Sequence, residues 1–308
     1  MMSPLLLLVG PTGVGKTAVG IELSTRLNGE IVSADSMQIY RGLDIGTAKA
    51  TPAEQLRARH HLIDIREPHE SYSAAQWADD ARCAIEDIRR RGKQPIIVGG
   101  TGFYIRALLQ PETLAGAAPD AELRARLEAE AAQHGAQHLH DRLRVLDAAA
   151  AERLHPNDVR RVIRAIEVAL SPNSSHSQPQ DSHETFTVFG LEMARDTLYR
   201  RLEGRIDHML HIGFMDELRA LVATAGHSST AMQSLGYKQM LPALSNPDIF
   251  DACVELWKRD TRRYAKRQMT WFRHQLPTQW LPVSEHTLPM QTADEIAARW
   301  RHSLESLI

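Results

Sequence analysis

The chain has 308 residues, enough for two domains, and its 43% hydrophobic content can fill a substantial core. Its net charge of −2 argues against a surface coated with positive charge, and no apolar run reaches the ~20 residues of a membrane helix. The only two cysteines, Cys83 and Cys253, lie far apart, which excludes a disulfide framework and a cysteine-based zinc module.

In the first hundred residues, short apolar runs alternate with amphipathic stretches. Met1–Val9 lacks a basic leader and runs straight into a glycine-rich loop, so we interpret it as the first strand of a cytoplasmic enzyme rather than a signal peptide. Strands are predicted at residues 5–9, 30–34, 62–65 and 95–98, and helices follow the glycine-rich loop to residue 27 and span residues 73–91. Alternating strands and helices predict an α/β fold with a doubly wound parallel sheet.

The composition changes after about residue 111. Residues 119–170 are rich in Ala, Arg, Glu and Leu without a strand signal, and Asn157 or Asp158 can cap a helix there. Residues 171–184 are polar, proline-containing and aperiodic, which is typical of a flexible surface loop. A strand at 186–191 precedes long helices. We therefore predict a first core part (1–112), a helical insertion (113–170), a flexible loop (171–185), and core completion with C-terminal helices (186–308).

A phosphate-binding P-loop follows the first predicted strand. The pattern G-x-x-x-x-G-K-[ST] is formed by Gly10, Pro11, Thr12, Gly13, Val14, Gly15, Lys16 and Thr17. Its glycines let consecutive N–H groups point inward, the next helix adds its positive end, and Lys16 adds a full charge. The Thr17 hydroxyl is a candidate ligand for Mg²⁺, the expected cofactor. The pattern indicates that a diphosphate is bound, but it does not identify the molecule that carries the diphosphate.

The strand that carries the magnesium-organising acid in P-loop ATPases ends here in Gly99 and Gly100. The acid at a neighbouring strand end is Asp35. Because ligands bind beyond the carboxyl ends of parallel strands, we expect Asp35 and Thr101 to face the phosphate site. Asp35 can serve there as a base or as a magnesium ligand, and the pattern leaves both open.

A helical stretch at residues 257–273 has two contrasting faces. At 100° per residue, Trp257, Tyr264 and Trp271 share one half with Phe272. The other half carries seven cations against a single Asp260: Lys258, Arg259, Arg262, Arg263, Lys266, Arg267 and Arg273. A solvated helix face normally mixes signs, so this excess favours a polyanion partner. Arg160, Arg161 and Arg164 form a second basic cluster, and together they suggest a nucleic acid substrate.

Eleven segments in order resemble the tRNA dimethylallyltransferase family, also called tRNA isopentenyl transferases. They are residues 10–17, 33–36, 44–49, 60–64, 72–74, 99–104, 155–158, 161–168, 198–218, 235–239 and 266–273. The resemblance implies a P-loop kinase-like parallel sheet core with an inserted small all-helical domain and a helical C-terminal region. It implies transfer of a dimethylallyl group from dimethylallyl diphosphate to N6 of adenosine 37 in tRNAs that read codons beginning with U.

The resemblance also implies roles for individual residues. Asp35 corresponds to the general base, Thr101 to a residue that contacts the target base and positions the leaving diphosphate, and Arg205 to an arginine that engages the diphosphate. Expected contacts with the tRNA anticodon stem-loop are Asp35, Ser36, Met37, Gln38, Thr101, Arg124, Arg160, Arg161, Val162, Ile163, Arg164, Gln233, Ser234, Leu235, Gly236, Tyr237, Lys238, Lys266, Arg267, Gln268, Met269, Thr270, Trp271, Phe272 and Arg273. We expect a monomer without zinc and without a membrane association.

Some residues depart from the family pattern, and two other functions remain open. Gln233 and Lys238 replace arginines of the family pattern, which weakens the expected RNA contacts there. A P-loop kinase acting on a small metabolite would leave the cationic face at residues 258–273 unexplained. A nucleotide-gated RNA-binding protein would not need Asp35 or Thr101. A transfer assay with labelled dimethylallyl diphosphate and unmodified tRNA separates the three.

Overall fold

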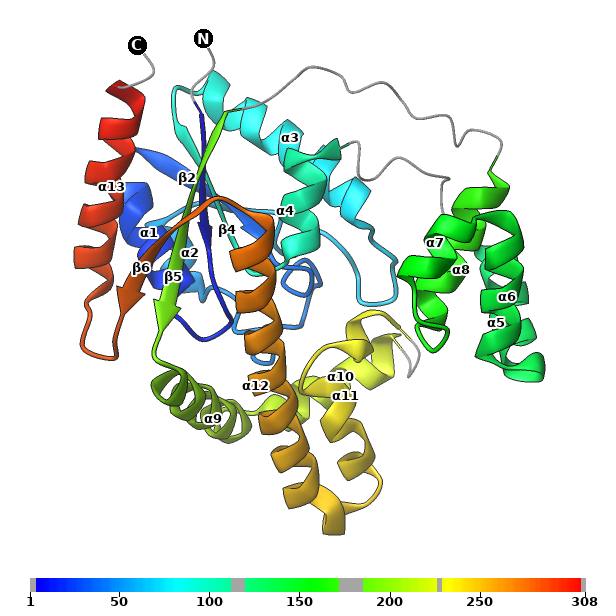
Figure 1. Ribbon diagram of the computed structural model, residues 1–308. Helices are drawn as coiled ribbons and strands as arrows, with labels where there is room; N and C mark the ends of the chain where they lie inside the picture. Colours follow the sequence, from blue (N-terminus) through cyan, green and yellow to red (C-terminus); the bar gives the residue numbers. More distant parts are fainter. Residues whose placement is uncertain (1–3, 112–119, 172–184, 226–228, 306–308) are drawn as a thin grey trace. The chain divides into compact units, whose positions relative to one another are not determined.

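The computed structural model describes residues 4–111, 120–171, 185–225 and 229–305 (Figure 1). The chain divides into two compact units, one formed by Met1–Leu109 with His183–Ile308 and the other by Gln110–Ser182. The predicted insertion, residues 113–170, falls within the second unit. Most of the predicted flexible loop, residues 171–185, lies outside the described residues. None of the described helices is both long and apolar enough to span a membrane.

The first unit is built on a six-stranded sheet in which every adjacent pair is parallel, as predicted. Its order is β3-β2-β4-β1-β5-β6. The strands are β1 (Leu5–Val9), β2 (Gly29–Ala34), β3 (His60–His61), β4 (Gln94–Gly99), β5 (Phe186–Met193) and β6 (Thr278–Val283). Strand β1 is fully buried between β4 and β5, which explains its uninterrupted run of four leucines and a valine. Its carboxyl end leads directly into the P-loop.

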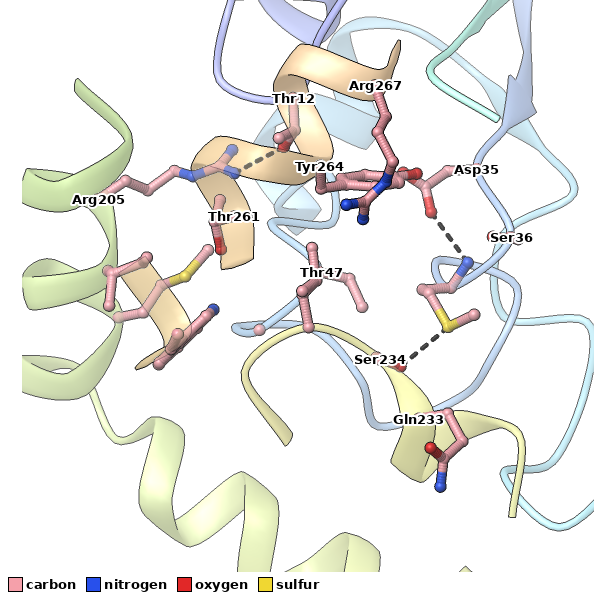
Figure 2. Close-up of a pocket in the computed structure, with 16 residues that line it drawn as sticks. Thr12, Asp35, Ser36, Thr47, Arg205, Gln233, Ser234, Thr261, Tyr264 and Arg267 are labelled. Atoms are coloured by element: carbon pink, nitrogen blue, oxygen red, sulfur yellow. Dashed lines mark hydrogen bonds between the residues drawn. The ribbon is translucent and has the colours of Figure 1, made fainter. Parts of the chain in front are cut away.

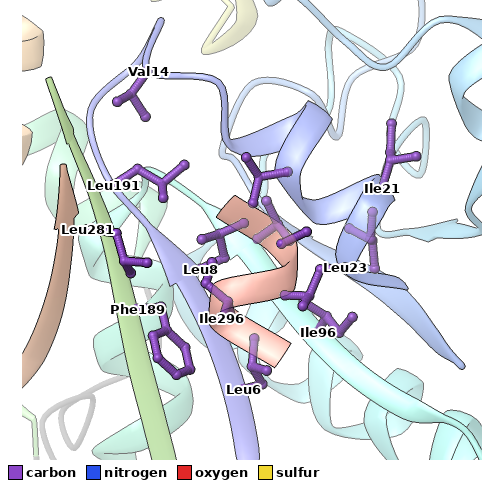
Figure 3. Close-up of a cluster of buried hydrophobic side chains, with 14 of the residues drawn as sticks. Leu6, Leu8, Val14, Ile21, Leu23, Ile96, Phe189, Leu191, Leu281 and Ile296 are labelled. Carbon is purple, nitrogen blue, oxygen red and sulfur yellow. The ribbon is translucent and has the colours of Figure 1, made fainter. Parts of the chain in front are cut away.

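Helices cover both faces of this sheet. Figure 1 shows α1 (Lys16–Arg26) beside α13 (Pro289–Glu305) on one face, with α3 (Ala74–Arg90) and α4 (Gly102–Leu109) on the other. Helix α3 begins at Ser73, whose hydroxyl accepts the Gln76 amide while the Gln76 side chain accepts the Ser73 amide. The main core packs Leu6 and Leu8 of β1 against Ile296 of α13 (Figure 3). The short helix α2 (Pro52–Arg57) has no buried residue.

A second hydrophobic cluster lies among the helices after β5. These helices are α9 (Arg195–His211), α10 (Phe214–Ala225), α11 (Tyr237–Met240) and α12 (Phe250–Gln275), with single 3-10 turns at Ala231–Gln233, Leu241–Leu244 and Pro247–Ile249. The ring of Phe214 lies 5.1 Å from that of Tyr237 and 4.5 Å from that of Trp257. This buried ring cluster fixes α12 against α10 and α11.

The second unit is helical throughout its described part. It comprises α5 (Ala121–His134), α6 (Ala136–Leu146), α7 (Ala148–Arg153) and α8 (Val159–Leu170). Val162 and Ile163 of α8 are buried among leucines of this unit, and their contact with tRNA stays a prediction. The predicted capping of α8 is wrong. Asp158 occupies the capping position without a capping hydrogen bond, and its carboxylate lies 3.3 Å from Arg161 Nε instead.

The predicted strand at residues 62–65 is wrong. The third strand comprises only His60–His61, after which Leu62 and Asp64 take positive φ angles of 62° and 55°. Extended strand geometry requires negative φ, so the chain turns away from the sheet here. The apolar residues Leu62, Ile63 and Ile65 gave a strand-like pattern, although they belong to a turn that packs against residues 38–40 through backbone hydrogen bonds.

Strand β6 was missed, because residues 192–308 were expected to be helical. Pro282 lies inside β6, and proline removes a donor that a central strand would need. Strand β6 is at the edge of the sheet and pairs only with β5, so proline is tolerated there. A proline-containing edge strand between two long helices gives almost no periodic signal.

Gly99 provides a test of how closely β4 approaches β2. A Cβ at Gly99 would lie 2.2 Å from the backbone oxygen of Ala34, whereas one at Gly204 in α9 would meet nothing within 4 Å. We therefore expect Gly99→Ala to lower the free energy of unfolding by about 1–3 kcal/mol. Gly204→Ala should raise it by about 0.5–1 kcal/mol. Urea denaturation of both variants checks this, and equal stabilities would contradict the close approach.

Candidate active site

The P-loop connects β1 to α1 and depends on glycines with positive φ. Gly13 and Gly15 have φ angles of 81° and 106°, which side chains disfavour. Lys16 folds back over the loop, and its Nζ donates to the carbonyls of Gly10 (3.0 Å) and Pro11 (2.8 Å). The pKa of Lys16 is lowered to about 8, mainly by burial; Asp35 opposes this shift and nearby Arg205 adds to it. The positive charge of the buried ammonium is therefore poorly compensated by nearby negative charge, which suits a group that binds an anion.

Two adjoining cavities lie at this end of the sheet. The first, which we call the P-loop cavity, has a volume of about 250 Å³. Its lining includes Thr12, Gly13, Gly15, Lys16, Thr17, Asp35, Gln38, Thr47, Glu54, Arg201 and Arg205. The second, the α12 cavity, has a volume of about 330 Å³ and is lined in part by apolar side chains of Ile206, Met209, Leu235 and Trp257. The two share Thr12, Asp35, Thr47 and Arg205, so a ligand can extend from one into the other.

Asp35 follows β2 directly and lines both cavities, as the position of the strand end predicts. Its Oδ1 accepts the amides of Met37 (2.9 Å) and Gln38 (3.4 Å), which fixes the carboxylate at the start of a turn. Figure 2 shows this carboxylate near Tyr264 and Arg267. Burial raises the pKa of the Tyr264 phenol and Asp35 raises it further, so the phenol stays protonated beside the carboxylate.

Thr101 lies next to this turn rather than in the cavities. Its Oγ1 accepts the Ser36 amide at 3.1 Å and lies 3.4 Å from the Ser36 hydroxyl. Thr101 does not line either of the two cavities, so the expectation that it faces the phosphate site is not met. Thr101 nevertheless accepts a hydrogen bond from Ser36, the residue that follows Asp35.

Arg205 of α9 reaches the P-loop from the opposite side. Its Nη2 donates to the Thr12 hydroxyl at 2.8 Å (Figure 2). The pKa of Arg205 is lowered to about 10, mainly by burial with a contribution from Arg201, and Asp35 opposes the shift. Its buried Nε has no hydrogen-bond partner in the described structure. An arginine with an unused buried donor in a cavity of other cations is suited to bind an anionic ligand.

Arg201 was missed by the sequence reasoning. It lies one helical turn before Arg205 on α9, lines the P-loop cavity, and would approach a Cβ on Gly15 to 3.8 Å. The spacing of four residues in Arg201-Leu-Glu-Gly-Arg205 places both arginines on one helix face, and that spacing was the available signal. Three cations therefore converge on the P-loop cavity.

The cationic half of α12 is largely neutralised, which corrects the predicted seven-to-one excess. Lys258 lies 2.8 Å from Asp207, Arg262 pairs with Glu203, and Arg273 lies 2.8 Å from Glu192. Arg259 and Arg263 both lie within 4 Å of Asp260. The carboxylates of α9 and β5 are remote in sequence, so the helix pattern could not show them. Lys266 is exposed without a carboxylate partner in the described part of the chain, and Arg267 lines the α12 cavity.

The structure places other predicted tRNA contacts in different surroundings. Those on the cavities are Ser36, Met37, Gln38, Gln233, Ser234 and Leu235, whereas Lys238, Thr270 and Arg160 are exposed elsewhere. The side chains of Tyr237, Phe272 and Gln268 are buried, and contacts of these residues with tRNA stay predictions. In the second unit, Arg124 and Arg164 both donate to the buried carboxylate of Glu167, at 2.8 and 2.7 Å.

The P-loop cavity also has suitable donors for a hard cation. Thr17, Asp35 and Glu54 all line it with oxygen atoms, the ligand type that Mg²⁺ prefers. Across the described residues no group of three or more His, Cys, Asp or Glu is arranged to hold a metal ion. Mg²⁺ commonly takes one or two protein oxygens and completes its shell with phosphate and water. The donors present therefore fit a magnesium ion that enters with a diphosphate.

Comparison with known proteins is decisive for the family. Residues 38–275 match the family described as IPP transferase. The chain is 47% identical to a tRNA dimethylallyltransferase of Exiguobacterium sibiricum, covering 91% of this chain and 90% of the relative. It is 42% identical to that of Bacillus licheniformis, with 95% of both covered. The chain belongs to the IPP transferase family. It is therefore an enzyme, a prenyltransferase.

Solved structures of family members agree with the fold. A tRNA isopentenylpyrophosphate transferase from Bacillus halodurans is similar with a TM-score of 0.72 and 39% identity, covering 99% of each chain. A eukaryotic dimethylallyltransferase described as acting on tRNA is similar with a TM-score of 0.81 and 28% identity, covering 98% of this chain and 80% of that one. The P-loop α/β core predicted from the resemblance is thus confirmed.

Arg201 can be tested against its neighbour. Arg201→Gln removes one of three cations from the P-loop cavity, so the KM for the diphosphate substrate should rise about tenfold. Arg200→Gln is the matched control, because Arg200 points toward Glu285 at 3.9 Å and lies outside both cavities. Steady-state kinetics of both variants check this. An unchanged KM for Arg201→Gln would exclude a role in holding the diphosphate.

The lowered pKa of Lys16 predicts proton uptake on diphosphate binding. The free enzyme holds part of Lys16 neutral near pH 8, and an arriving anion raises its pKa. Calorimetric titration at pH 8 in two buffers of different ionisation enthalpy should show uptake that disappears at pH 6, where Lys16 is already charged. Lys16→Arg provides the control, because arginine stays protonated at either pH. Equal uptake by wild type and Lys16→Arg would assign the proton to another group.

Proposed function

We propose that this enzyme transfers a dimethylallyl group from dimethylallyl diphosphate to N6 of adenosine 37 in tRNAs that read codons beginning with U. The products are N6-(dimethylallyl)adenosine and diphosphate. The observation that carries this proposal is the position of Asp35 and Arg205, which both line the P-loop cavity and the adjoining α12 cavity. Asp35 as the base and Arg205 as the anion-binding group would then lie at the junction of the two cavities, where the bond to the leaving diphosphate would break. The relatives are named tRNA dimethylallyltransferases, which supports transfer of a dimethylallyl group to tRNA.

The two cavities suit the two ends of the prenyl donor. The P-loop cavity offers loop amides together with Lys16, Arg201 and Arg205 for the diphosphate. The α12 cavity offers the apolar side chains of Ile206, Met209 and Trp257 for the five-carbon chain. Mg²⁺ bound through Thr17 would neutralise part of the diphosphate charge. The P-loop thus holds a leaving group, and no γ-phosphate or attacking water has to be positioned.

In the proposed reaction, the N6 nitrogen of adenine forms a bond to C1 of the dimethylallyl group as the bond from C1 to the diphosphate oxygen breaks. The diphosphate leaves with the electron pair, and Lys16 and Arg205 stabilise its growing charge. Asp35 accepts the proton that N6 loses. An exocyclic amine is a weak nucleophile, so a positioned base contributes roughly 10²–10⁴ in rate. Adenosine 37 must leave its stack to reach the cavity, as in other base-modifying enzymes.

Each of the two units supplies residues for the proposed tRNA contacts. Lys266 and Arg267 supply positive charge beside the α12 cavity, with Gln233 and Leu235 at its lining. Arg160 and Arg161 supply exposed cations in the helical insertion, where Glu167 orients Arg124 and Arg164. Phosphate contacts of this kind give affinity and positioning without reading sequence. Since tRNA is the proposed acceptor, we propose that the enzyme acts in the cytoplasm. We also propose that it is a monomer.

The proposal is tested by incubating the enzyme with unmodified tRNA, Mg²⁺ and dimethylallyl diphosphate labelled in its carbon chain. Label should appear on adenosine 37 of tRNAs that read U-initial codons. Label that appears on other nucleosides would correct the site. No transfer, together with ATP-dependent phosphorylation of a small metabolite, would support a kinase instead.

Asp35→Asn then tests the base. The amide keeps an oxygen that accepts the Met37 and Gln38 amides, so the turn should remain intact. Single-turnover transfer should slow by roughly 10²–10⁴ while tRNA affinity is retained. Asp79→Asn is a suitable control, because the Asp79 side chain is 75% exposed, pairs with Arg82 of its own helix and lies outside both cavities. Near-normal turnover of Asp35→Asn would exclude Asp35 as the base.

A further inference from the structure

One stretch of both cavity walls belongs to no helix or strand. Gly46 and Thr47 line the α12 cavity, and Thr47 and Ala48 line the P-loop cavity. Ala48 has a φ of 50°, a left-handed conformation that alanine rarely adopts. We call residues 44–48 the wall segment. Its conformation is not favoured by its own sequence, so contacts from elsewhere must impose it.

Glu217 of α10 supplies the densest of these contacts. Its Oε2 accepts the amides of Asp44 at 2.8 Å and Ile45 at 2.7 Å, and its Oε1 accepts the amide of Gly46 at 2.9 Å. Three consecutive backbone N–H groups thus converge on one carboxylate, in the way a nest binds an anion. Hydrogen bonds to an ionised acceptor are roughly twice as strong as neutral ones.

The phenol of Tyr237 completes the coordination of Glu217. It donates to Oε1 from a fully buried ring. Burial raises the pKa of Tyr237 and the charge of Glu217 raises it further, so the phenol remains a donor at all physiological pH values. Gly46 lies against the same rings, and a Cβ there would come within 2.6 Å of both Phe214 and Tyr237. The wall segment therefore rests on α10 and α11 and presents its other side to the cavities.

The remaining anchors of the wall segment hold other atoms. Lys49 is buried, and its Nζ donates to Asp44 Oδ1 (2.6 Å), Asp64 Oδ1 (2.6 Å) and the Tyr40 carbonyl. The side chain of Gln38 donates to the Thr47 carbonyl at 3.2 Å. Neither accepts the amides of Asp44, Ile45 and Gly46. Without Glu217 all three donors would lose their acceptor, and the amides of Ile45 and Gly46 would lose it in a part-buried position.

We propose that Glu217 is a positioning residue that holds the wall segment in place and thereby sets the affinity for the prenyl donor. This rests on the proposed function, in which the donor spans both cavities. The reacting groups have independent supports: Asp35 is held by its own turn, Lys16 by loop carbonyls, and Arg205 by Thr12. A displaced wall segment should therefore weaken binding of the donor and leave the chemical step largely unchanged.

Glu217→Gln tests this with little change of shape. Both carboxylate oxygens of Glu217 accept hydrogen bonds, whereas the NH₂ group of glutamine is itself a donor. One side of the glutamine amide would therefore face N–H or O–H donors without accepting from them, so the wall segment should shift. We expect the KM for dimethylallyl diphosphate to rise about tenfold, with kcat within about threefold of wild type. Asp216→Asn is the matched control, since the Asp216 side chain is 83% exposed and pairs with Arg219 of its own helix. Its kinetic constants should equal those of wild type.

Tyr237→Phe keeps the ring and removes one donor to Glu217, so its KM should rise less than that of Glu217→Gln. It also serves as the test if Glu217→Gln fails to fold. A folded Glu217→Gln with unchanged KM, or one whose kcat falls as much as its KM rises, overturns the proposal. A merely structural residue would lower the melting temperature of the folded variant without this selective rise in KM.

Amide hydrogen exchange separates this inference from the proposed function. The amides of Asp44, Ile45 and Gly46 should exchange slowly in wild type and much faster in Glu217→Gln, with Asp216→Asn like wild type. This result does not depend on which reaction the enzyme catalyses. Equal exchange in wild type and Glu217→Gln overturns the positioning role even if transfer to tRNA is shown. Absence of transfer by wild type overturns the function and leaves the exchange result standing.

Discussion

The buried side-chain amide of Gln268 connects the three segments on which the active centre depends. Its oxygen accepts the Thr12 amide of the P-loop at 2.8 Å, and its nitrogen donates to the Gly100 carbonyl after β4 at 2.9 Å. Gly100 must be glycine for this contact, since a Cβ would lie 2.4 Å from the Gln268 nitrogen. Through the Thr12 hydroxyl, Arg205 of α9 joins the same network. One neutral side chain on α12 thus sets the spacing between the sheet, the P-loop and the C-terminal helices.

This network holds the positive charges of Lys16 and Arg205 close together in spite of their mutual repulsion. Burial lowers the pKa of Lys16 to about 8 and that of Arg205 to about 10, and each is affected by a neighbouring cation. Asp35 is the carboxylate that opposes the shift in both. The cost of desolvating these cations is met by folding, before any ligand arrives. In the proposed reaction, a diphosphate entering the P-loop cavity then meets donors that need little reorganisation, which is the condition for strong electrostatic stabilisation of a leaving group.

The sequence predicted those features whose signal is local. The P-loop requires eight consecutive residues in a fixed context, and Asp35 follows directly from the end of a recognisable strand. Arg201 needed only helical spacing, yet it was overlooked because nothing in the sequence says which face of α9 meets the P-loop. The predictions failed for strand β6 and for the turn at Leu62, because the conformation of both segments depends on residues that are close in space but distant in sequence. The Gln268 contacts and the acceptor role of Glu217 join residues more than 150 positions apart, so no spacing argument could reach them.

The charge pattern of α12 shows how tertiary pairing refines a correct local observation. A chain of net charge −2 can attract a polyanion only where its cations remain unpaired. Glu203 and Asp207 of α9 pair with Arg262 and Lys258, on the part of α12 that packs against α9. Further along the helix, Lys266 is exposed and Arg267 lies at the α12 cavity. Neutralising the first half of the helix removes competing anchoring points for phosphate, so the remaining positive charge lies near the α12 cavity. In the proposed function this is the cavity that the target base enters, and the acidic residues of α9 would contribute to the placement of the tRNA although they repel it.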